Sequence, residues 1–382
     1  MYRKIQADRL FDGFQFLSPD RVLILDESYR VLEIVSLADA GSDVQYFDGM
    51  VLPGFINAHC HIELSHLKRK IPMHTGLVDF VQGVMRLRET DPDRQFQAMQ
   101  DAEAEMYDSG IVAVGDICNT SASIRLKQNS RLQWHNFIET TGFVPATAAL
   151  RFQQSNQIWQ EFQAALPEQS STLVPHAPYS VSNELFALIN ATTSNQIISI
   201  HNQESPSENE LFLNKQGDFL RLYETLGIRL DFFEPTGKTS LKSWLPQFNR
   251  GQQILSVHNS FTGVDDLLFQ QALTSSFHYV ICIGANQYIE NAVPPLQLLW
   301  EHGCSWIMGT DSYASNHSLN LWEEVKQLQV QFPEMPETDC LQALTSRGAA
   351  ALGMQERLGS FKKGKQPGLV QVVDGRSSRI DR

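Results

Sequence analysis

Apolar runs that end in a histidine or an aspartate recur along this chain. Four of them end at His176, His201, His258 and Asp311, and cover residues 172–176, 197–201, 253–258 and 306–311. Longer stretches with helical patterns separate these runs, an order that is typical of parallel βα units. In a (β/α)8 barrel the catalytic groups lie where the strands end. The pattern therefore predicts an α/β fold of the TIM-type (β/α)8 class, with reactive side chains at one rim.

The residues near the two ends of the chain show a different pattern of apolar and turn-forming residues. Short apolar runs at residues 10–13, 22–26 and 31–35 alternate with turn signals, and residues 364–373 again read as loop and strand that could rejoin them. Because the chain has 382 residues, more than one average domain, we expect two domains. A small β-sandwich domain would take residues 1–50 plus 356–382, and the barrel would take residues 51–355.

Charge and cysteine usage argue against several classes of protein. The net charge of -13 disfavours a nucleic-acid partner, because phosphate binding usually needs clustered Lys and Arg. The five cysteines form no C-x-x-C pair, which suggests neither a disulfide framework nor a zinc ribbon. No apolar stretch reaches the roughly 20 residues that cross a bilayer. We expect a soluble cytoplasmic protein with a small-molecule substrate and no membrane partner, while homo-oligomerisation stays open.

The strongest local signal is the pair His59 and His61. With one residue between them, both imidazoles project to the same side of an extended strand and can ligate one ion. The apolar run at residues 51–56 precedes them, as expected for a buried strand. Glu204 follows His201 by a short turn, where a carboxyl group could handle protons. Each of these residues could be structural by itself, but their succession favours one shared metal site.

Five segments carry a resemblance to a known family. They are PGFINAHCH at residues 53–61, PHAPYS at 175–180, HNQE at 201–204, VH at 257–258 and GTDSYASN at 309–316. Together they resemble the amidohydrolase superfamily, in its deaminase and chlorohydrolase branch, over nearly the whole chain. The resemblance implies that the metal ligands are His59, His61, His201 and Asp311. It also implies proton-handling roles for Glu204, His258 and Asp311, and a place near the substrate for His176.

The implied ligand set agrees with hydrolytic chemistry. Three neutral imidazoles and one carboxylate leave a position for water, whose pKa a divalent metal lowers toward neutrality. Hydroxide attack on an aminopurine, with Glu204 protonating the ring nitrogen, would release ammonia. We prefer one Zn²⁺, although the same ligands accept Fe²⁺ or Mn²⁺. A second ion would need a bridging carboxylate near the end of a middle strand, and for Glu139 we favour a structural or substrate-positioning role.

Substrate-binding candidates lie in the loops. Glu63, Ser65 and His66 follow the H-x-H pair and could hydrogen-bond a substrate or cap the next helix. This loop is similar to that of aminodeoxyfutalosine deaminases more than to that of guanine or triazine enzymes. Such a substrate joins an adenine-type nucleoside to a benzoate, and the candidates for holding the carboxylate are Arg86, Arg88 and Arg151. Residues 282–290 depart from the branch's usual proline-containing turn, so no role is transferred to them.

Two alternatives stay open at this point. One is a related amidohydrolase that acts on a C–N or C–Cl bond of a cyclic amide, a triazine or a guanidine-like group. The other is an inactive barrel that serves as a binding module. Against the second, every position that the resemblance marks as essential carries a chemically competent residue. We therefore expect an aminopurine deaminase, with 6-amino-6-deoxyfutalosine as the preferred substrate.

Overall fold

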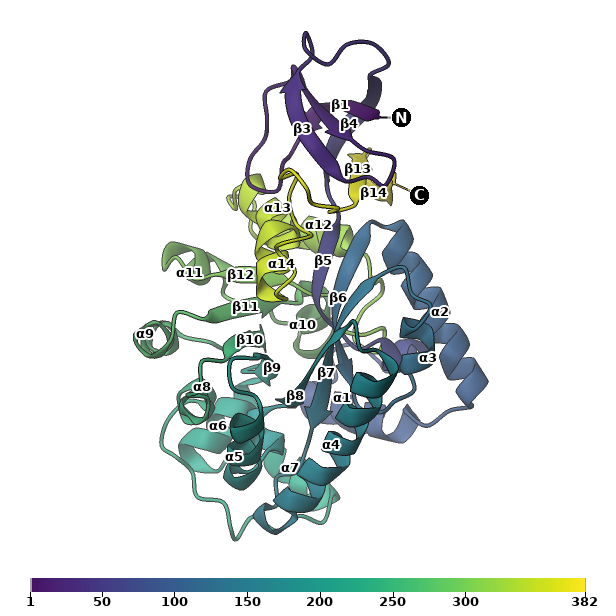
Figure 1. The fold of residues 1–382 in the computed structure, drawn as a ribbon. Coiled ribbons are helices and arrows are strands. Elements are labelled where there is room, and N and C mark those ends of the chain that lie inside the picture. The colour runs from purple at the N-terminus through teal and green to yellow at the C-terminus, as the bar shows by residue number, and fades with distance from the viewer. Residues whose placement is uncertain (1, 382) are drawn as a thin grey trace.

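Two four-stranded parallel sheets form the centre of the computed structural model, which describes residues 2–381 (Figure 1). Their orders are β5-β6-β7-β8 and β12-β11-β10-β9, so neighbours in space are also neighbours in sequence. The strands are β5 (Phe55–Cys60), β6 (Ile111–Cys118), β7 (Gln133–Thr140), β8 (Ser170–Pro175), β9 (Ile197–Asn202), β10 (Gln253–His258), β11 (Phe277–Ile281) and β12 (Trp306–Met308). The strands predicted from the apolar runs are thus confirmed.

The two parallel sheets meet at both of their outer strands. On one side, the His201 backbone N–H of β9 donates to the His176 carbonyl, which follows β8, at 3.0 Å. On the other side, the backbone N–H groups of Thr310 and Asp311 both donate to the His59 carbonyl of β5 at 3.1 Å. Residues from the two sheets therefore lie side by side at each seam, where the predicted site residues are concentrated.

Helices pack against the outside of these strands (Figure 1). One of them, α2, shows how the sequence sets a helix start: the Asp91 side chain caps the backbone N–H groups of Asp93 and Arg94, and Pro92 opens the first turn. The α-helices are α1 (Leu77–Leu87), α2 (Pro92–Asp108), α3 (Ile124–Lys127), α4 (Ala148–Ala165), α5 (Asn183–Thr192), α6 (Pro206–Asn214), α7 (Phe219–Thr225), α8 (Ser240–Trp244), α9 (Val264–Leu273), α10 (Ile283–Glu290), α11 (Leu296–Glu301), α12 (Leu321–Gln331), α13 (Glu337–Leu344) and α14 (Ser346–Ala351). Short 3₁₀ turns are η1 (Ile62–Leu67), η2 (Pro145–Thr147), η3 (Pro178–Ser180) and η4 (Leu245–Gln247).

Both ends of the chain join one six-stranded sheet with the order β14-β13-β4-β1-β2-β3 (Figure 1, purple and yellow). Its strands are β1 (Arg3–Leu10), β2 (Arg21–Leu25), β3 (Val31–Ser36), β4 (Gln45–Pro53), β13 (Leu369–Val373) and β14 (Arg376–Arg379). β13 pairs antiparallel with β4, which confirms that the C-terminal segment rejoins the N-terminal strands. A second layer that would make this sheet a sandwich stays a prediction.

One expected strand is misplaced. Leu10 is the last residue of β1 and Phe11 bridges Phe16, while Asp12 and Gly13 belong to the turn after the strand, in which the Asp12 carboxylate accepts the backbone N–H groups of Phe14 and Gln15 at 2.7 and 2.9 Å. Gly13 in this turn has φ of +104°, a conformation that few other residues adopt. β4 also runs through the predicted domain boundary at residue 50 and continues almost directly into β5. The six-stranded sheet is therefore covalently and structurally continuous with the first strand of the site.

Among residues 2–381, no helix has both the length and the apolar character that crossing a bilayer would require.

Candidate active site

The four predicted metal ligands converge on one point. His59 lies on β5, His61 directly follows that strand, His201 lies on β9 and Asp311 follows β12. The Nε2 atom of His61 lies 3.1 Å from His59 Nε2 and 3.3 Å from His201 Nε2. Asp311 Oδ1 lies 3.3 Å from His61 Nε2 and 3.5 Å from His59 Nε2. All four residues are buried, so strand ends far apart in sequence place four donor atoms together.

These donor spacings fit a divalent metal ion. Four ligands at the usual zinc distances of about 2.0–2.1 Å in a tetrahedron stand about 3.3 Å from one another. The His201 Nδ1 atom donates to the His176 carbonyl at 2.8 Å, which leaves the Nε2 lone pair of the same ring facing the cluster. Burial alone would raise the pKa of Asp311, but the hydrogen bond from His59 and the charge of His61 lower it, so the carboxylate is ionised. The donor set can therefore hold one divalent ion.

Backbone conformations with positive φ occur where the strands end at the site. Four residues at or shortly after the ends of β9, β10 and β12 have positive φ: Gln203 at +47°, His258 at +74°, Asn259 at +58° and Asp311 at +56°. Such angles cost a residue other than glycine of the order of 1–3 kcal/mol, so the surrounding contacts must hold them in place. The ends of β9 and β10 are tied together by the buried amides of Asn202 and Asn259, which hydrogen-bond at 3.1 Å.

Glu204 and His258 form a second pair beside the donor cluster. Glu204 Oε1 lies 3.5 Å from His258 Nε2, and the two residues are 4% and 1% exposed. Burial, reinforced by the charge of Asp311, raises the pKa of the Glu204 carboxyl well above its ordinary value. Burial lowers the pKa of His258 to about 3. Burial therefore favours the protonated form of the acid and the neutral form of the imidazole, which can give and receive a proton respectively.

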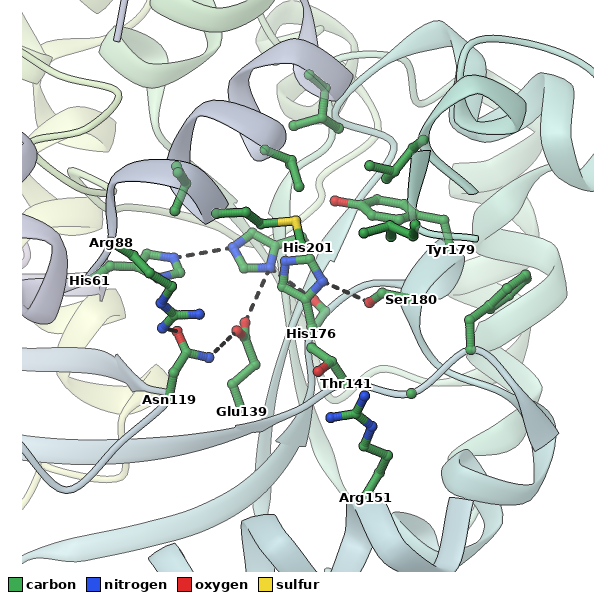
Figure 2. A pocket seen from close by; sticks show the side chains of 18 of the residues that line it. His61, Arg88, Asn119, Glu139, Thr141, Arg151, His176, Tyr179, Ser180 and His201 are labelled. Atoms are coloured by element: carbon green, nitrogen blue, oxygen red, sulfur yellow. Dashed lines mark hydrogen bonds and ion pairs between the residues drawn. The ribbon is translucent and has the colours of Figure 1, made fainter. Parts of the chain in front are cut away.

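A cavity of about 770 Å³ opens onto this cluster. Among the predicted site residues, its lining includes His61, His176, His201, Glu204, His258, Asp311 and Arg151. His176 sits next to His201, and its Nδ1 atom lies 2.7 Å from the Ser180 hydroxyl (Figure 2). Apolar residues that include Leu77, Phe80 and Val84 line another part of the wall. Metal donors, proton-handling groups and a substrate-sized space therefore share one cavity.

The loop after the H-x-H pair has a different place from the one expected. Glu63 does not line the cavity: its carboxylate accepts the backbone N–H groups of Asn119 and Thr120, each at 3.3 Å. The Ser65 hydroxyl donates to the Ile62 carbonyl at 2.7 Å. Both side chains are buried within η1 and its contacts, so the geometry gives no support to their predicted contact with a substrate.

A polar chain in the cavity wall was only partly foreseen. Arg88 donates to the Asn119 side-chain oxygen at 3.3 Å, and the Asn119 amide donates to Glu139 Oε2 at 2.6 Å (Figure 2). The other Glu139 oxygen lies 3.7 Å from His201 Nδ1. Asn119 was missed, although it directly follows β6 and the rule of polar strand ends would have found it. These contacts connect the Arg88 guanidinium at the cavity, through Asn119 and Glu139, to the imidazole of the donor His201.

Behind this wall lies a buried ion pair. Lys127 Nζ donates to Asp116 Oδ2 at 2.5 Å and lies 3.2 Å from Cys118 Sγ, and Asp116 also accepts the Ile62 backbone N–H at 2.9 Å. The Lys127 ammonium is therefore engaged by Asp116 and Cys118, and Lys127 is not among the residues that line the cavity. Asp116 in turn holds the backbone immediately after His61.

Comparison with known proteins gives this geometry its family. The model of the amidohydrolase family matches residues 50–380. The chain belongs to the amidohydrolase family. It is 27% identical to an aminodeoxyfutalosine deaminase of Nitratiruptor sp., with 96% of this chain and 91% of that protein covered. It is 26% identical to an adenosine deaminase of Helicobacter pylori, over 89% of this chain and 86% of that protein.

Solved structures of amidohydrolase-family deaminases have the same fold. The Helicobacter pylori aminofutalosine deaminase in complex with methylthio-coformycin matches with a TM-score of 0.78 and 25% identity, covering 96% of this chain and 91% of that one. An adenosine deaminase of Xanthomonas campestris with bound zinc matches with a TM-score of 0.73 at 19% identity, over 97% of this chain and 84% of that one, which is a likeness of fold alone. This amidohydrolase-family chain thus falls in the deaminase branch and is a hydrolase that acts on carbon–nitrogen bonds.

Proposed function

We propose that this chain is a metal-dependent hydrolytic deaminase of an aminopurine nucleoside, with 6-amino-6-deoxyfutalosine as its substrate. The observation that carries the proposal is the position of Glu204, a buried carboxyl group whose pKa is raised by burial, in the wall of the cavity that opens onto the four-donor cluster. An acid of this kind suits protonation of a purine ring nitrogen near neutral pH. The names of the curated relatives support an adenosine-like substrate.

The proposal assigns one divalent metal ion, preferably Zn²⁺, to His59, His61, His201 and Asp311. When bound, such an ion lowers the pKa of a water molecule so that hydroxide is available at neutral pH. Glu204 then donates its proton to the ring nitrogen beside the attacked carbon. His258 Nε2 and the Asp311 carboxylate would orient the nucleophile, receive its proton and pass that proton to the exocyclic amine, which leaves as ammonia.

The polar part of the cavity supports a substrate that carries a carboxylate. Arg151 lines the cavity beyond His176, and Arg88 lines it beside Asn119 (Figure 2). A guanidinium group binds a carboxylate through two parallel hydrogen bonds, a geometry that a neutral ribose substituent does not provide. Arg86 is not among the lining residues. We therefore assign the benzoate carboxylate to Arg151, while His176 contacts the nucleoside near the donor cluster.

The finer description of the fold belongs to the same proposal. We infer that the two parallel sheets close into one (β/α)8 barrel at residues 51–355, which is supported by the hydrogen bonds at both seams. We infer that residues 1–50 and 356–382 form the small β-sandwich domain. Apolar clusters on different strand residues support this, one around Leu23 and Leu25 and another around Val22 and Ile24.

A substrate panel tests the function directly. Zinc-loaded protein is incubated with aminodeoxyfutalosine, adenosine, 5'-methylthioadenosine, S-adenosylhomocysteine and guanine, with ammonia release and product mass as readouts. The expected result is ammonia together with a product about one mass unit heavier, as amine becomes carbonyl, and the highest kcat/KM for aminodeoxyfutalosine. Hydrolysis of a cyclic amide or a triazine without ammonia from any aminopurine would contradict the proposal. A protein that binds an aminopurine without turnover would instead indicate a binding module.

A further inference from the structure

Gly142 lies in the loop after β7, packed against helix α4. Its backbone N–H donates to the Ser180 carbonyl at 2.7 Å, and its carbonyl accepts the Ser182 backbone N–H at 2.9 Å. These two bonds join the loop after β7 to the loop after β8, where Gly142 forms an isolated parallel bridge with Val181. The glycine backbone is therefore held by both of its polar groups, and a retreat from the helix would break these hydrogen bonds.

Helix α4 is held in its place by two side chains that follow Arg151 at intervals of about one turn. The Ser155 hydroxyl donates to the Glu139 carbonyl at 3.3 Å, and the Trp159 indole N–H donates to the Ser171 carbonyl at 3.1 Å. Glu139 belongs to β7 and Ser171 to β8, so the helix is anchored to both strands. The helix backbone at Arg151 therefore has little freedom to move away from the loop.

The missing side chain of Gly142 leaves room for the stem of Arg151. A Cβ atom on residue 142 would lie 2.7 Å from Arg151 Cγ and 3.1 Å from Arg151 Cβ, well inside the roughly 3.5–4.0 Å at which carbon atoms pack. It would also lie 3.1 Å from Leu185 Cδ2. Because Arg151 Cγ can move away only by rotation about χ1, and a helical side chain has few χ1 positions, the rotation would carry the guanidinium to another place.

The guanidinium group at the end of this stem faces the cavity. Arg151 and Gly142 both line the cavity, and Figure 2 shows the guanidinium directed toward Thr141. Among residues 2–381, the structure pairs its N–H groups with no carboxylate or carbonyl. The other arginine of the cavity wall, Arg88, is engaged by Asn119. The donors of Arg151 are therefore available to an anionic group of a ligand.

We propose that Gly142 is a positioning residue for Arg151, and that its missing Cβ thereby determines the specificity of the site for substrates that carry a carboxylate. This inference rests on the proposed function, in which Arg151 binds the benzoate carboxylate. A bidentate pair needs two parallel N–H donors, so a guanidinium displaced by a χ1 rotation loses both bonds to a carboxylate that stays in place. A Cβ on residue 142 weakens this contact and leaves the four-donor cluster untouched.

Equilibrium binding of two deamination products tests this role without turnover. The probes are the 6-oxo products of aminodeoxyfutalosine and of adenosine, of which only the first carries a carboxylate. Calorimetric titration of the zinc-loaded full-length protein gives a Kd for each. In Gly142→Ala we expect Kd for the carboxylate-bearing product to rise by about 10-fold, as loss of a charge-assisted pair implies, while Kd for the other product stays within about 3-fold.

A double-variant cycle separates displacement of the arginine from a general effect on the loop. In Arg151→Ala the Cγ atom is absent, so the further change Gly142→Ala should leave Kd for the carboxylate-bearing product within about 2-fold of Arg151→Ala alone. Gly263→Ala is the matched control, because Gly263 has φ of -105° and its Cβ would meet nothing nearer than the Asp266 carboxylate at 4.0 Å. This variant should change neither Kd.

An unchanged ratio of the two Kd values in folded Gly142→Ala would overturn the role of Gly142, and so would an equal further loss of binding in the Arg151→Ala background. If Gly142→Ala does not fold, the double variant decides: recovery of folding supports the contact with the arginine stem, and continued failure to fold contradicts it. Since binding requires no turnover, failure of every aminopurine as a substrate would count against the proposed function, while the ratio of the two Kd values would still decide the role of Gly142.

Discussion

Glu204 Oε1 faces His258 Nε2 across 3.5 Å at the edge of the four-donor cluster. The two groups are tuned in opposite directions by the same burial, which favours the neutral form of each. A carboxyl group whose pKa is raised and an imidazole whose pKa is lowered can serve as an acid and a base at one pH. The predictions below follow from this arrangement and from its surroundings.

Replacing the acid should separate turnover from metal binding. In Glu204→Gln the cluster of His59, His61, His201 and Asp311 is untouched, so metal content should equal that of the unmodified protein. Because a positioned proton donor contributes about 10²–10⁴-fold, kcat should fall by at least about 10²-fold. Steady-state kinetics and elemental analysis on the same preparation check both halves. Activity near the original level would remove Glu204 from the proton-donor role.

Removing a cluster histidine should abolish metal retention. His59→Ala deletes one of four donors whose affinity is collective, and the purified variant should hold a small fraction of one equivalent of metal. His317→Ala is a suitable control, because this histidine is exposed and lies outside the donor cluster. Elemental analysis after dialysis against a weak chelator gives the comparison. Full occupancy in His59→Ala would contradict the assigned ligand set.

Neutralising the cavity arginine should affect carboxylate-bearing substrates selectively. Arg151→Met should raise KM for aminodeoxyfutalosine by about 10-fold or more, because a charge-assisted pair contributes roughly 1.5–3 kcal/mol. The same variant should leave kcat/KM for adenosine within about 3-fold. Arg229→Met, at an exposed residue paired with Asp231 outside the cavity wall, is the control. An equal loss of kcat/KM for both substrates would mean that Arg151 does not bind the carboxylate.

Glu208 makes stability depend on pH. It is fully buried on α6, and burial raises its pKa from 4.5 to about 7, even though the Ser240 hydroxyl hydrogen-bonds it. Between these two values the folded protein holds a proton that the unfolded chain has lost, so stability falls as pH rises across this window. Glu208→Gln should therefore reduce the decline in the free energy of unfolding from about pH 5 to about pH 7.5, measured by urea titration. Glu210→Gln, exposed on the same helix, should leave the decline unchanged.

The sequence allowed the donor cluster to be predicted because its members obey a local rule. His59 and His201 lie on apolar strands and Asp311 follows one, and strand ends in such folds share one rim. Glu63 could not be placed in the same way. Whether a polar side chain in a loop faces a substrate or the backbone of a neighbouring loop depends on tertiary contacts, here those with Asn119 and Thr120.

The same limit explains the pairs that were missed. The Asn119 bridge between Arg88 and Glu139 joins three elements that are distant in sequence, and no spacing pattern records such a partnership. The run at residues 10–13 was misread because its apolar residues resemble a strand, while Asp12 and Gly13 decide the local geometry.

The pairing of β13 with β4 also determines when this protein can finish folding. β4 leads into β5 and therefore into His59, yet its neighbour β13 occupies residues close to the end of the chain. The ribosome synthesises β13 long after β4, so the strand that presents the first metal ligands cannot acquire its full support until Leu369–Val373 has emerged. Nascent chains that stop short of Leu369 should accordingly remain without a stable donor cluster.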